Sequence, residues 1–84
     1  MQKYYPYTLS ELRSQARDKE LSFVRQLAMY LMKKFTNKSL QEIGYFFARK
    51  DHTTVMHAVS KIRHSLQHDE VFDEQVKKIE QELF

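Results

Sequence analysis

The sequence predicts an all-α fold, a small helical bundle, from its length and its lack of turn and strand signals. The chain has 84 residues, with 42% hydrophobic and 30% charged content, which suits one small domain over residues 1–84. A single Gly and a single Pro leave almost no turn chemistry for β-hairpins. Val, Ile and Thr nowhere form the alternating runs that are typical of strands. A large enzyme is excluded by size.

The first two helices are predicted from a capping box and from apolar periodicity. Thr8 and Glu11 have the spacing of a capping box, so a short helix is expected to begin at Thr8. The polar stretch 14–20 is predicted to be a loop or a fraying link between helices. From residue 21 to residue 35, apolar side chains recur every three or four positions and predict a long helix with one buried stripe. Arg25 is predicted to lie off this stripe, which consists of Leu21, Val24, Leu27, Ala28, Leu31 and Phe35.

A helix-turn-helix is predicted over about 39–67. A second capping box at 39–42 opens a short helix, and a polar turn at 48–51 ends with Asp51, a candidate N-cap for a longer helix. In a helix-turn-helix the second helix enters the DNA major groove with its N-terminal end first. The inward side of the two helices is predicted to consist of Leu40, Ile43, Phe46, Phe47, Val55, Ala58, Val59, Ile62 and Leu66.

The charge is distributed unevenly along the chain. The net charge is +1 over residues 1–20, +6 over 21–68 and −4 over 69–84, although the whole chain carries only +3. A focused basic region suits a DNA surface, because Lys and Arg neutralise phosphates and release counterions. Asp69 is expected to cap a closing helix that is mostly acidic outside and is therefore expected to face away from DNA; its inward residues are Phe72, Val76, Ile79 and Leu83. The alternative is that the basic residues only keep the domain soluble.

Four residues at the start of the predicted second helix are candidate base readers: Asp51, His52, Thr53 and Thr54. A carboxylate can accept from cytosine N4, an imidazole can donate or accept, and the threonine methyl groups suit the thymine methyl. The alternative is that the threonines are ordinary first-turn residues. Gly44 in the preceding helix costs about 1 kcal/mol relative to alanine, which predicts that the two helices cross closely there.

Three stretches of the chain resemble a known family. They are Tyr4-Tyr5, Arg25-Gln26-Leu27-Ala28-Met29-Tyr30-Leu31, and Ile43-Gly44 followed by Arg49-Lys50-Asp51-His52-Thr53-Thr54-Val55-Met56-His57-Ala58. Together they closely resemble the C-terminal DNA-binding domain (domain IV) of the DnaA family of bacterial chromosomal replication initiators. The resemblance implies a Trp-repressor-like helical domain. It also implies binding to DnaA boxes, which are short asymmetric A·T-rich elements at replication origins and some promoters.

The resemblance also implies which residues of this chain would contact DNA and which part of the DNA each would contact. Base reading falls on Asp51, His52, Thr53 and Thr54, and the phosphate contacts fall on Arg25, Gln26, Lys33, Ser39, Leu40, Lys50 and His57. In the family a loop arginine enters the minor groove, and this position corresponds to Arg17, with Lys19 beside it. Ala48 and Arg49 stand where the family turn usually carries two glycines, and Arg49 adds a candidate phosphate contact.

The sequence lacks the residue patterns that an ATP site, a metal site or a catalytic site would require. The sequence contains no GxxxxGK[ST] loop, so we expect no ATP site and no cofactor. Of the histidines at 52, 57, 64 and 68, only His64 and His68 have an i, i+4 spacing, and no third ligand joins them, so no metal site is expected. We find no catalytic constellation of nucleophile and base and expect no enzyme activity. Without cysteine or long apolar runs, the chain is expected to be cytoplasmic and nucleoid-associated, with no membrane span.

Two functional hypotheses follow from the sequence alone. The first is sequence-specific binding of double-stranded DNA, linked to the initiation or regulation of chromosomal replication, with other replication-initiation proteins as further partners. The second is a protein-interaction module that uses the acidic last helix, or a small transcriptional or replication regulator with non-specific DNA affinity. In either case the chain is an excised domain or a stand-alone homologue.

Overall fold

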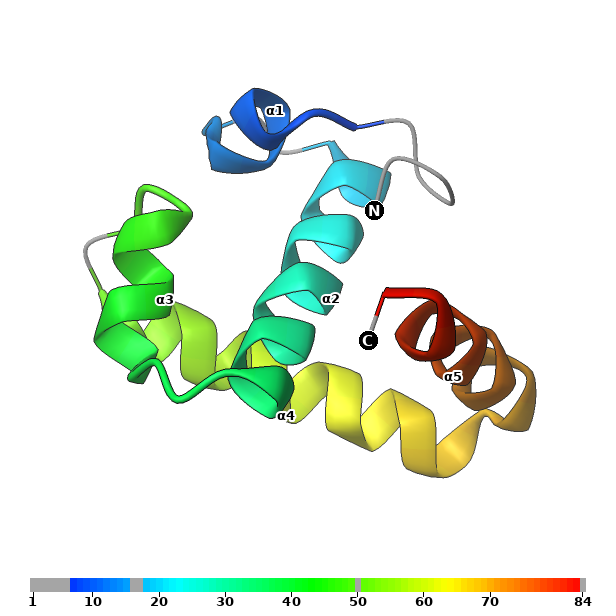
Figure 1. Ribbon diagram of the computed structural model, residues 1–84. Helices are drawn as coiled ribbons and strands as arrows, with labels where there is room; N and C mark the ends of the chain where they lie inside the picture. Colours follow the sequence, from blue (N-terminus) through cyan, green and yellow to red (C-terminus); the bar gives the residue numbers. More distant parts are fainter. Residues whose placement is uncertain (1–6, 16–17, 50, 84) are drawn as a thin grey trace.

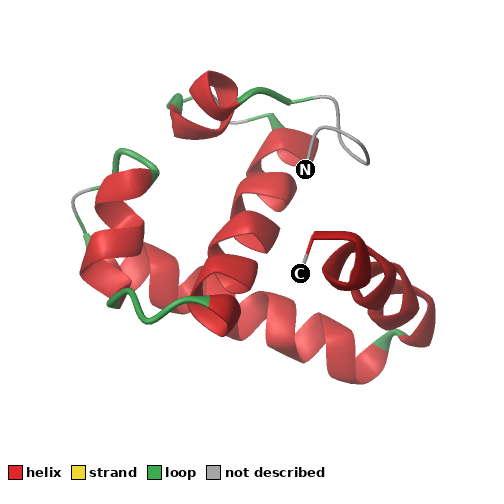
Figure 2. Ribbon diagram, in the orientation of Figure 1, coloured by secondary structure: helices red, strands yellow, loops and turns green. Residues whose placement is uncertain are grey.

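The computed structural model describes residues 7–15, 18–49 and 51–83, and this part of the chain is helical without strands (Figures 1 and 2). The all-α prediction is therefore confirmed. The helices are α1 (Leu9–Arg13), α2 (Lys19–Phe35), α3 (Leu40–Phe46), α4 (His52–His68) and α5 (Glu70–Leu83). The pair formed by α3 and α4 is the predicted helix-turn-helix.

Helix α2 is the central element of the fold. It contacts α1, α3 and α4, while α5 packs against α4. Figure 1 shows α1 lying across one end of α2, α4 crossing near the other end, and α5 placed beyond the C-terminal half of α4. The Phe23 and Phe72 rings, with centroids 5.5 Å apart, join α2 to α5. The N-terminal end of α4 and the start of α5 therefore lie far apart, whereas the later turns of α5 fold back toward α2, where Glu80 pairs with Lys34 (Figure 1).

Local capping explains where the first two helices begin. The Thr8 hydroxyl accepts from the Glu11 N–H at 3.2 Å, and the Glu11 carboxylate accepts from the Thr8 N–H at 3.2 Å, which confirms the predicted capping box. Helix α2 begins earlier than predicted, because the Asp18 carboxylate accepts from the Leu21 N–H at 2.9 Å. A prediction from apolar periodicity misses this first turn, because it begins with Lys19 and Glu20, which are charged helix formers. The predicted loop is therefore wrong at Lys19 and Glu20.

The predicted starts of the later helices are confirmed. Ser39 and Glu42 form the second capping box, with hydrogen bonds of 3.1 and 3.0 Å. The Asp51 carboxylate accepts from the Thr53 N–H at 2.9 Å, and the Asp69 carboxylate accepts from the Phe72 N–H at 3.1 Å. Each cap satisfies a backbone donor that the first helical turn leaves without a partner.

The core takes residues from all five helices, and it differs from the predicted inward residues in two ways. Leu12, Met29 and Tyr30 are buried although they were not predicted to be, and three further residues lie on the opposite side from the prediction. The side chain of Leu83, another predicted core residue, lies outside the described part of the structure. Arg25 is 7% exposed and so lies inside the fold, whereas Phe35 and Phe46 are 38% and 40% exposed. Ile43 in α3 and its i+4 neighbour Phe47, the C-cap of that helix, occupy the inward side, so Phe46 points elsewhere. The buried apolar residues are Leu12, Leu21, Val24, Leu27, Met29, Tyr30, Leu31, Ile43, Phe47, Val55, Ala58, Val59, Ile62, Phe72, Val76 and Ile79.

Candidate nucleic-acid interface

The start of α4 is an exposed, capped helix end. Asp51, His52 and Thr54 are exposed and Thr53 is half-buried. Hydrogen bonds from the backbone and side chain of Thr53 lower the pKa of the Asp51 carboxyl below its ordinary value, and the nearby His52 and His57 contribute less. The Asp51 carboxylate is therefore ionised at neutral pH, and its bond to the Thr53 N–H holds the first turn of α4 in place. The four predicted base readers lie together at this end.

The exposed side of α4 carries basic side chains and no acidic ones. Residues 52–68 contain no Asp or Glu, and the exposed side chains include His57, Lys61 and Arg63. The buried side of the helix, formed by Val55, Ala58, Val59 and Ile62, packs toward α2 and α3. Packing and charge thus divide α4 into an apolar side that fixes the helix and a basic side that faces solvent.

The predicted phosphate contacts fall into different environments. Lys33 near the end of α2 is exposed, and so is His57. At the start of α3 the Ser39 N–H already donates to the Glu42 carboxylate at 3.0 Å, and these bonds lower the pKa of Glu42. The capping box thus places a negative charge at the helix start where an anion contact with Ser39 and Leu40 is predicted.

Arg25 and Gln26 are held within the fold. Arg25 Nε donates to the Leu12 carbonyl at 2.6 Å, and Arg25 Nη2 donates to the Ser14 carbonyl at 3.1 Å. These bonds attach the last turn of α1 to α2. Gln26 is half-buried, and its side-chain oxygen has no hydrogen-bond partner within the described part of the chain. Phosphate contact by either residue stays a prediction, and the structure gives Arg25 a second, structural role.

The turn between α3 and α4 is tightly built. Ala48 has φ 58°, in the left-handed region. The Arg49 N–H donates to the Gly44 carbonyl at 2.7 Å. A Cβ at Gly44 would lie 3.2 Å from the Arg49 oxygen, which is tight, and 3.5 Å from Val55 Cγ2 in α4, which is ordinary contact, so the close approach at Gly44 is not the predicted helix crossing. The tighter neighbour is the backbone of the turn rather than α4.

Two predicted site residues, Arg17 and Lys50, lie outside the described residues, as do Tyr4 and Tyr5. Lys19, the second predicted minor-groove residue, is exposed and belongs to the first turn of α2 rather than to a loop. Minor-groove contact by Arg17 and Lys19 stays a prediction.

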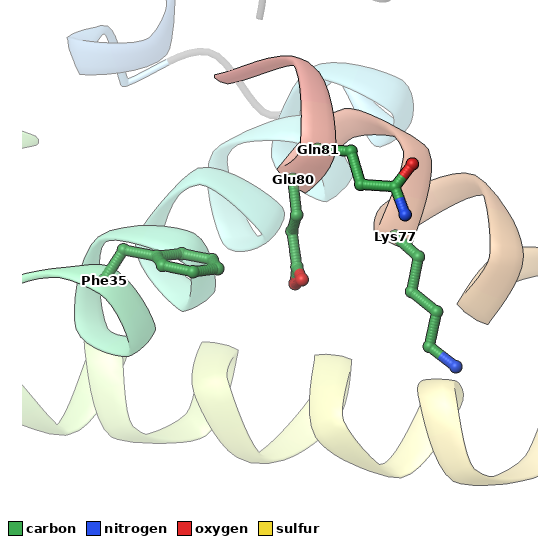
Figure 3. Close-up of a pocket in the computed structure, with 4 residues that line it drawn as sticks. All are labelled: Phe35, Lys77, Glu80 and Gln81. Atoms are coloured by element: carbon green, nitrogen blue, oxygen red, sulfur yellow. The ribbon is translucent and has the colours of Figure 1, made fainter. Parts of the chain in front are cut away.

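A shallow hollow of about 300 Å³ lies in a different region, between the end of α2 and α5. Figure 3 shows the side chains that line it, Phe35, Lys77, Glu80 and Gln81. Lys34 contacts two of these residues, since its Nζ lies 2.9 Å from a Glu80 carboxylate oxygen and 5.3 Å from the centre of the Phe35 ring. With charges of both signs and one ring, the hollow does not resemble the basic surface of α4.

The described residues offer no sign of two other kinds of site. Within these ranges, no three His, Asp or Glu side chains gather as metal ligands would. The His64 and His68 rings lie 4.3 Å apart along the exposed side of α4. No described helix combines the length and the apolar character needed to cross a bilayer.

Comparison with known proteins assigns the helix-turn-helix to a family. Residues 1–62 match the family described as bacterial DnaA protein helix-turn-helix. The chain belongs to this family. Chromosomal replication initiator proteins DnaA from Thermoanaerobacter sp. (strain X514) and Thermoanaerobacter pseudethanolicus (strain ATCC 33223 / 39E) are each 41% identical to it over 81 residues, or 96% of this chain. The chain spans 18% of the length of these DnaA relatives. The DnaA family match contains α1, α2, α3 and α4 as far as Ile62, and thus every predicted DNA-contact residue.

Proposed function

We propose that this chain binds double-stranded DNA sequence-specifically, at DnaA-box-like sites, in the initiation or regulation of chromosomal replication. The observation that carries the proposal is the exposed, capped start of α4 in a helix-turn-helix of the DnaA family. This helix end is built as a major-groove reader, because its first turn is polar and its sides bear no acidic residue after Asp51. The names of the relatives motivate the link to replication initiation.

The proposal separates reading from positioning. Asp51, His52, Thr53 and Thr54 contact base edges in the major groove, whereas the phosphate contacts come from Arg25, Gln26, Lys33, Ser39, Leu40, Lys50 and His57. Arg17 and Lys19 approach the minor groove. The exposure of His52, Thr54, Lys33, Lys19 and His57 supports this division.

The placement of charge supports the same orientation on DNA. Helix α5 carries Glu70, Asp73, Glu74 and Glu80 and lies beyond the C-terminal half of α4 (Figure 1). The start of α4 therefore approaches the DNA, and most of the acidic side chains of α5 lie away from that end, as Coulomb repulsion favours. Glu80 is the exception, since it pairs with Lys34 at 2.9 Å, beside the proposed phosphate contact Lys33. We further propose that the protein acts in the cytoplasm at the nucleoid, and that other replication-initiation proteins are its partners. DNA binding in this proposal uses no ATP site and no catalytic residue of this chain.

A fluorescence anisotropy titration tests the proposal. The protein is titrated into a labelled duplex that contains a DnaA box and into a scrambled duplex of equal composition, at several salt concentrations. We expect binding to the box to be at least ~10-fold tighter, and both affinities to fall with salt as counterions are released. Equal affinities for the two duplexes would refute sequence-specific recognition. The absence of binding to either duplex would refute DNA binding altogether and leave the interaction-module hypothesis.

A further inference from the structure

Two segments that are far apart in the sequence are linked by reciprocal hydrogen bonds. Arg49 Nη2 donates to the Ser14 carbonyl at 2.9 Å, across 35 residues of chain. In the opposite direction, Gln15 Nε2 donates to the Ala48 carbonyl at 3.5 Å. Ser14 and Gln15 follow α1, and residues 48 and 49 precede α4, so these bonds join the end of α1 to the turn after α3 (Figure 1).

The Arg49 guanidinium bridges three backbone carbonyls. Besides Ser14, it reaches the Phe47 carbonyl at 3.0 Å and the Ala48 carbonyl at 3.5 Å, both through Nη1. The planar guanidinium presents donors in a fixed fork, so it can hold two chain segments at one separation, which a lysine ammonium on a flexible stem cannot do. Arg49 is half-buried in this position. Its nitrogens therefore point into the fold toward carbonyls.

The Arg49 bridge holds the backbone next to Ala48, a residue in an unfavourable left-handed conformation. Ala48, at φ 58°, adopts a left-handed geometry that costs about 1–2 kcal/mol for a residue with a Cβ. Asp51, the N-cap of α4, follows only three residues later. A rotation within this turn would therefore change where the first turn of α4 lies relative to α1 and α2.

The same Ser14 carbonyl also accepts from Arg25 Nη2 at 3.1 Å, so it connects α1 to both α2 and the turn. Burial and the nearby Arg49 charge lower the pKa of Arg25. Placing a second guanidinium beside Arg25 is thus electrostatically unfavourable in the protein alone. The arrangement is better explained by a need to define geometry than by a gain in stability.

We propose that Arg49 is a positioning residue for DNA recognition. By joining the α3–α4 turn to the end of α1, it sets the position of the base-reading end of α4 relative to α1 and to Arg25 of α2, which shares the Ser14 carbonyl. Arg49 thereby controls discrimination between a DnaA box and other duplexes, and it does not bind phosphate itself. This inference rests on the proposed function and assigns Arg49 a different role from the phosphate contact that the sequence indicated.

The salt dependence of binding separates positioning from phosphate contact. In the box and scrambled titrations, Arg49→Lys and Arg49→Gln are expected to lower the ratio of the two affinities about ten-fold, the effect of weakening one base contact. The slope of log affinity against log salt is expected to stay at the wild-type value in both variants, because no phosphate contact is lost. The control Lys33→Gln is expected to weaken binding to both duplexes equally and to reduce the slope by about 1.

Gln15→Ala provides an independent test on the other side of the link, because Gln15 is exposed and its removal spares the Arg49 bridge. It is expected to lower the affinity ratio by less than the Arg49 variants, with the slope unchanged. Thermal melting confirms that each variant folds. A wild-type affinity ratio in folded Arg49→Lys, or a reduced salt slope in Arg49→Gln, would overturn the inference. If the wild-type protein itself does not distinguish the duplexes, the proposed function fails instead.

Discussion

Helices α4 and α5 are built alike but present opposite charges to solvent. Each starts at an aspartate whose carboxylate caps the first turn, and each buries one apolar side against the rest of the fold. The exposed side of α4 bears His52, His57, Lys61 and Arg63, and the residues of that helix include no Asp or Glu. Helix α5 instead carries most of the acidic residues of its region, with −4 net charge over 69–84.

The difference teaches that folding and recognition are encoded on separate sides of the same elements. The apolar side of each helix determines where it packs, through burial worth roughly 1.5–3 kcal/mol for each large aliphatic side chain. The polar side determines what approaches it. An identical architecture with the α5 charges on α4 would be expected to fold and to repel DNA.

The largest expected effect comes from breaking the packing that the two helices share. Ile62 in α4 is 0% exposed and Ile79 in α5 is 2% exposed, so Ile62→Ala and Ile79→Ala remove the same atoms from matched environments. We expect a loss of about 2–5 kcal/mol for each, because a cavity remains. The loss is expected to be greater for Ile62, since α4 contacts α2, α3 and α5. Urea unfolding measures both, and a greater loss for Ile79→Ala would contradict this ranking.

The next largest effect concerns DNA discrimination, which is expected to depend on the exposed side of α4 and not on that of α5. His52→Ala is expected to reduce discrimination between a DnaA box and a scrambled duplex by about 1–3 kcal/mol, because it removes a proposed base reader. Glu74→Gln, on the exposed side of α5, serves as the matched control and is expected to keep the wild-type discrimination. Anisotropy titrations at one salt concentration measure both variants. Unchanged discrimination in His52→Ala would remove this residue from the set of base readers.

A smaller effect on stability is expected from the backbone conformation of the residues that precede the two helices. It reaches α4 through Ala48 at φ 58°, whereas it reaches α5 through Asp69 at φ −139°, in the extended region. Ala48→Gly is expected to stabilise the protein by about 0.5–1 kcal/mol, since relief of the left-handed strain exceeds the entropy that glycine adds to the unfolded chain. Thermal melting checks the sign. A destabilised Ala48→Gly would show that the left-handed residue is not a source of strain.

The smallest effect concerns acid and the cap of α4. Because the pKa of Asp51 is lowered in the folded state, its carboxylate contributes stability above the ordinary Asp pKa of about 3.9, and this contribution is lost as the pH falls through the lower folded pKa. Asp51→Asn keeps a capping oxygen without the titration. The melting temperature of the wild type relative to Asp51→Asn is therefore expected to decline as the pH falls from neutral to below the ordinary Asp pKa of about 3.9. A difference that does not vary with pH would contradict this assignment.

The helix starts are predictable from the sequence because their signals are local. Thr8, Ser39, Asp51 and Asp69 each act on a backbone donor two or three residues away. The start of α2 was not predicted, because the residues that follow its cap, Lys19 and Glu20, are charged and show no apolar periodicity. Caps therefore predict helix starts better than periodicity does.

The candidate site is predictable where residue type alone determines the role. The exposed start of α4 lies where the sequence indicates, with Asp51 as its cap. The burial of Arg25 and the bridge from Arg49 were not predictable, because their acceptors are backbone carbonyls of Leu12 and Ser14, which no side chain reveals. Long-range bonds to the main chain leave no pattern in the sequence.

A competition experiment tests the central claim most directly. The wild-type protein is bound to a labelled DnaA-box duplex at fixed salt and challenged with unlabelled box duplex or unlabelled scrambled duplex. We expect the box to displace the label at a concentration at least ~10-fold below that required for the scrambled duplex, as a specific base-reading helix requires. Displacement by both duplexes at the same concentration would contradict the account that the exposed start of α4 reads DNA sequence.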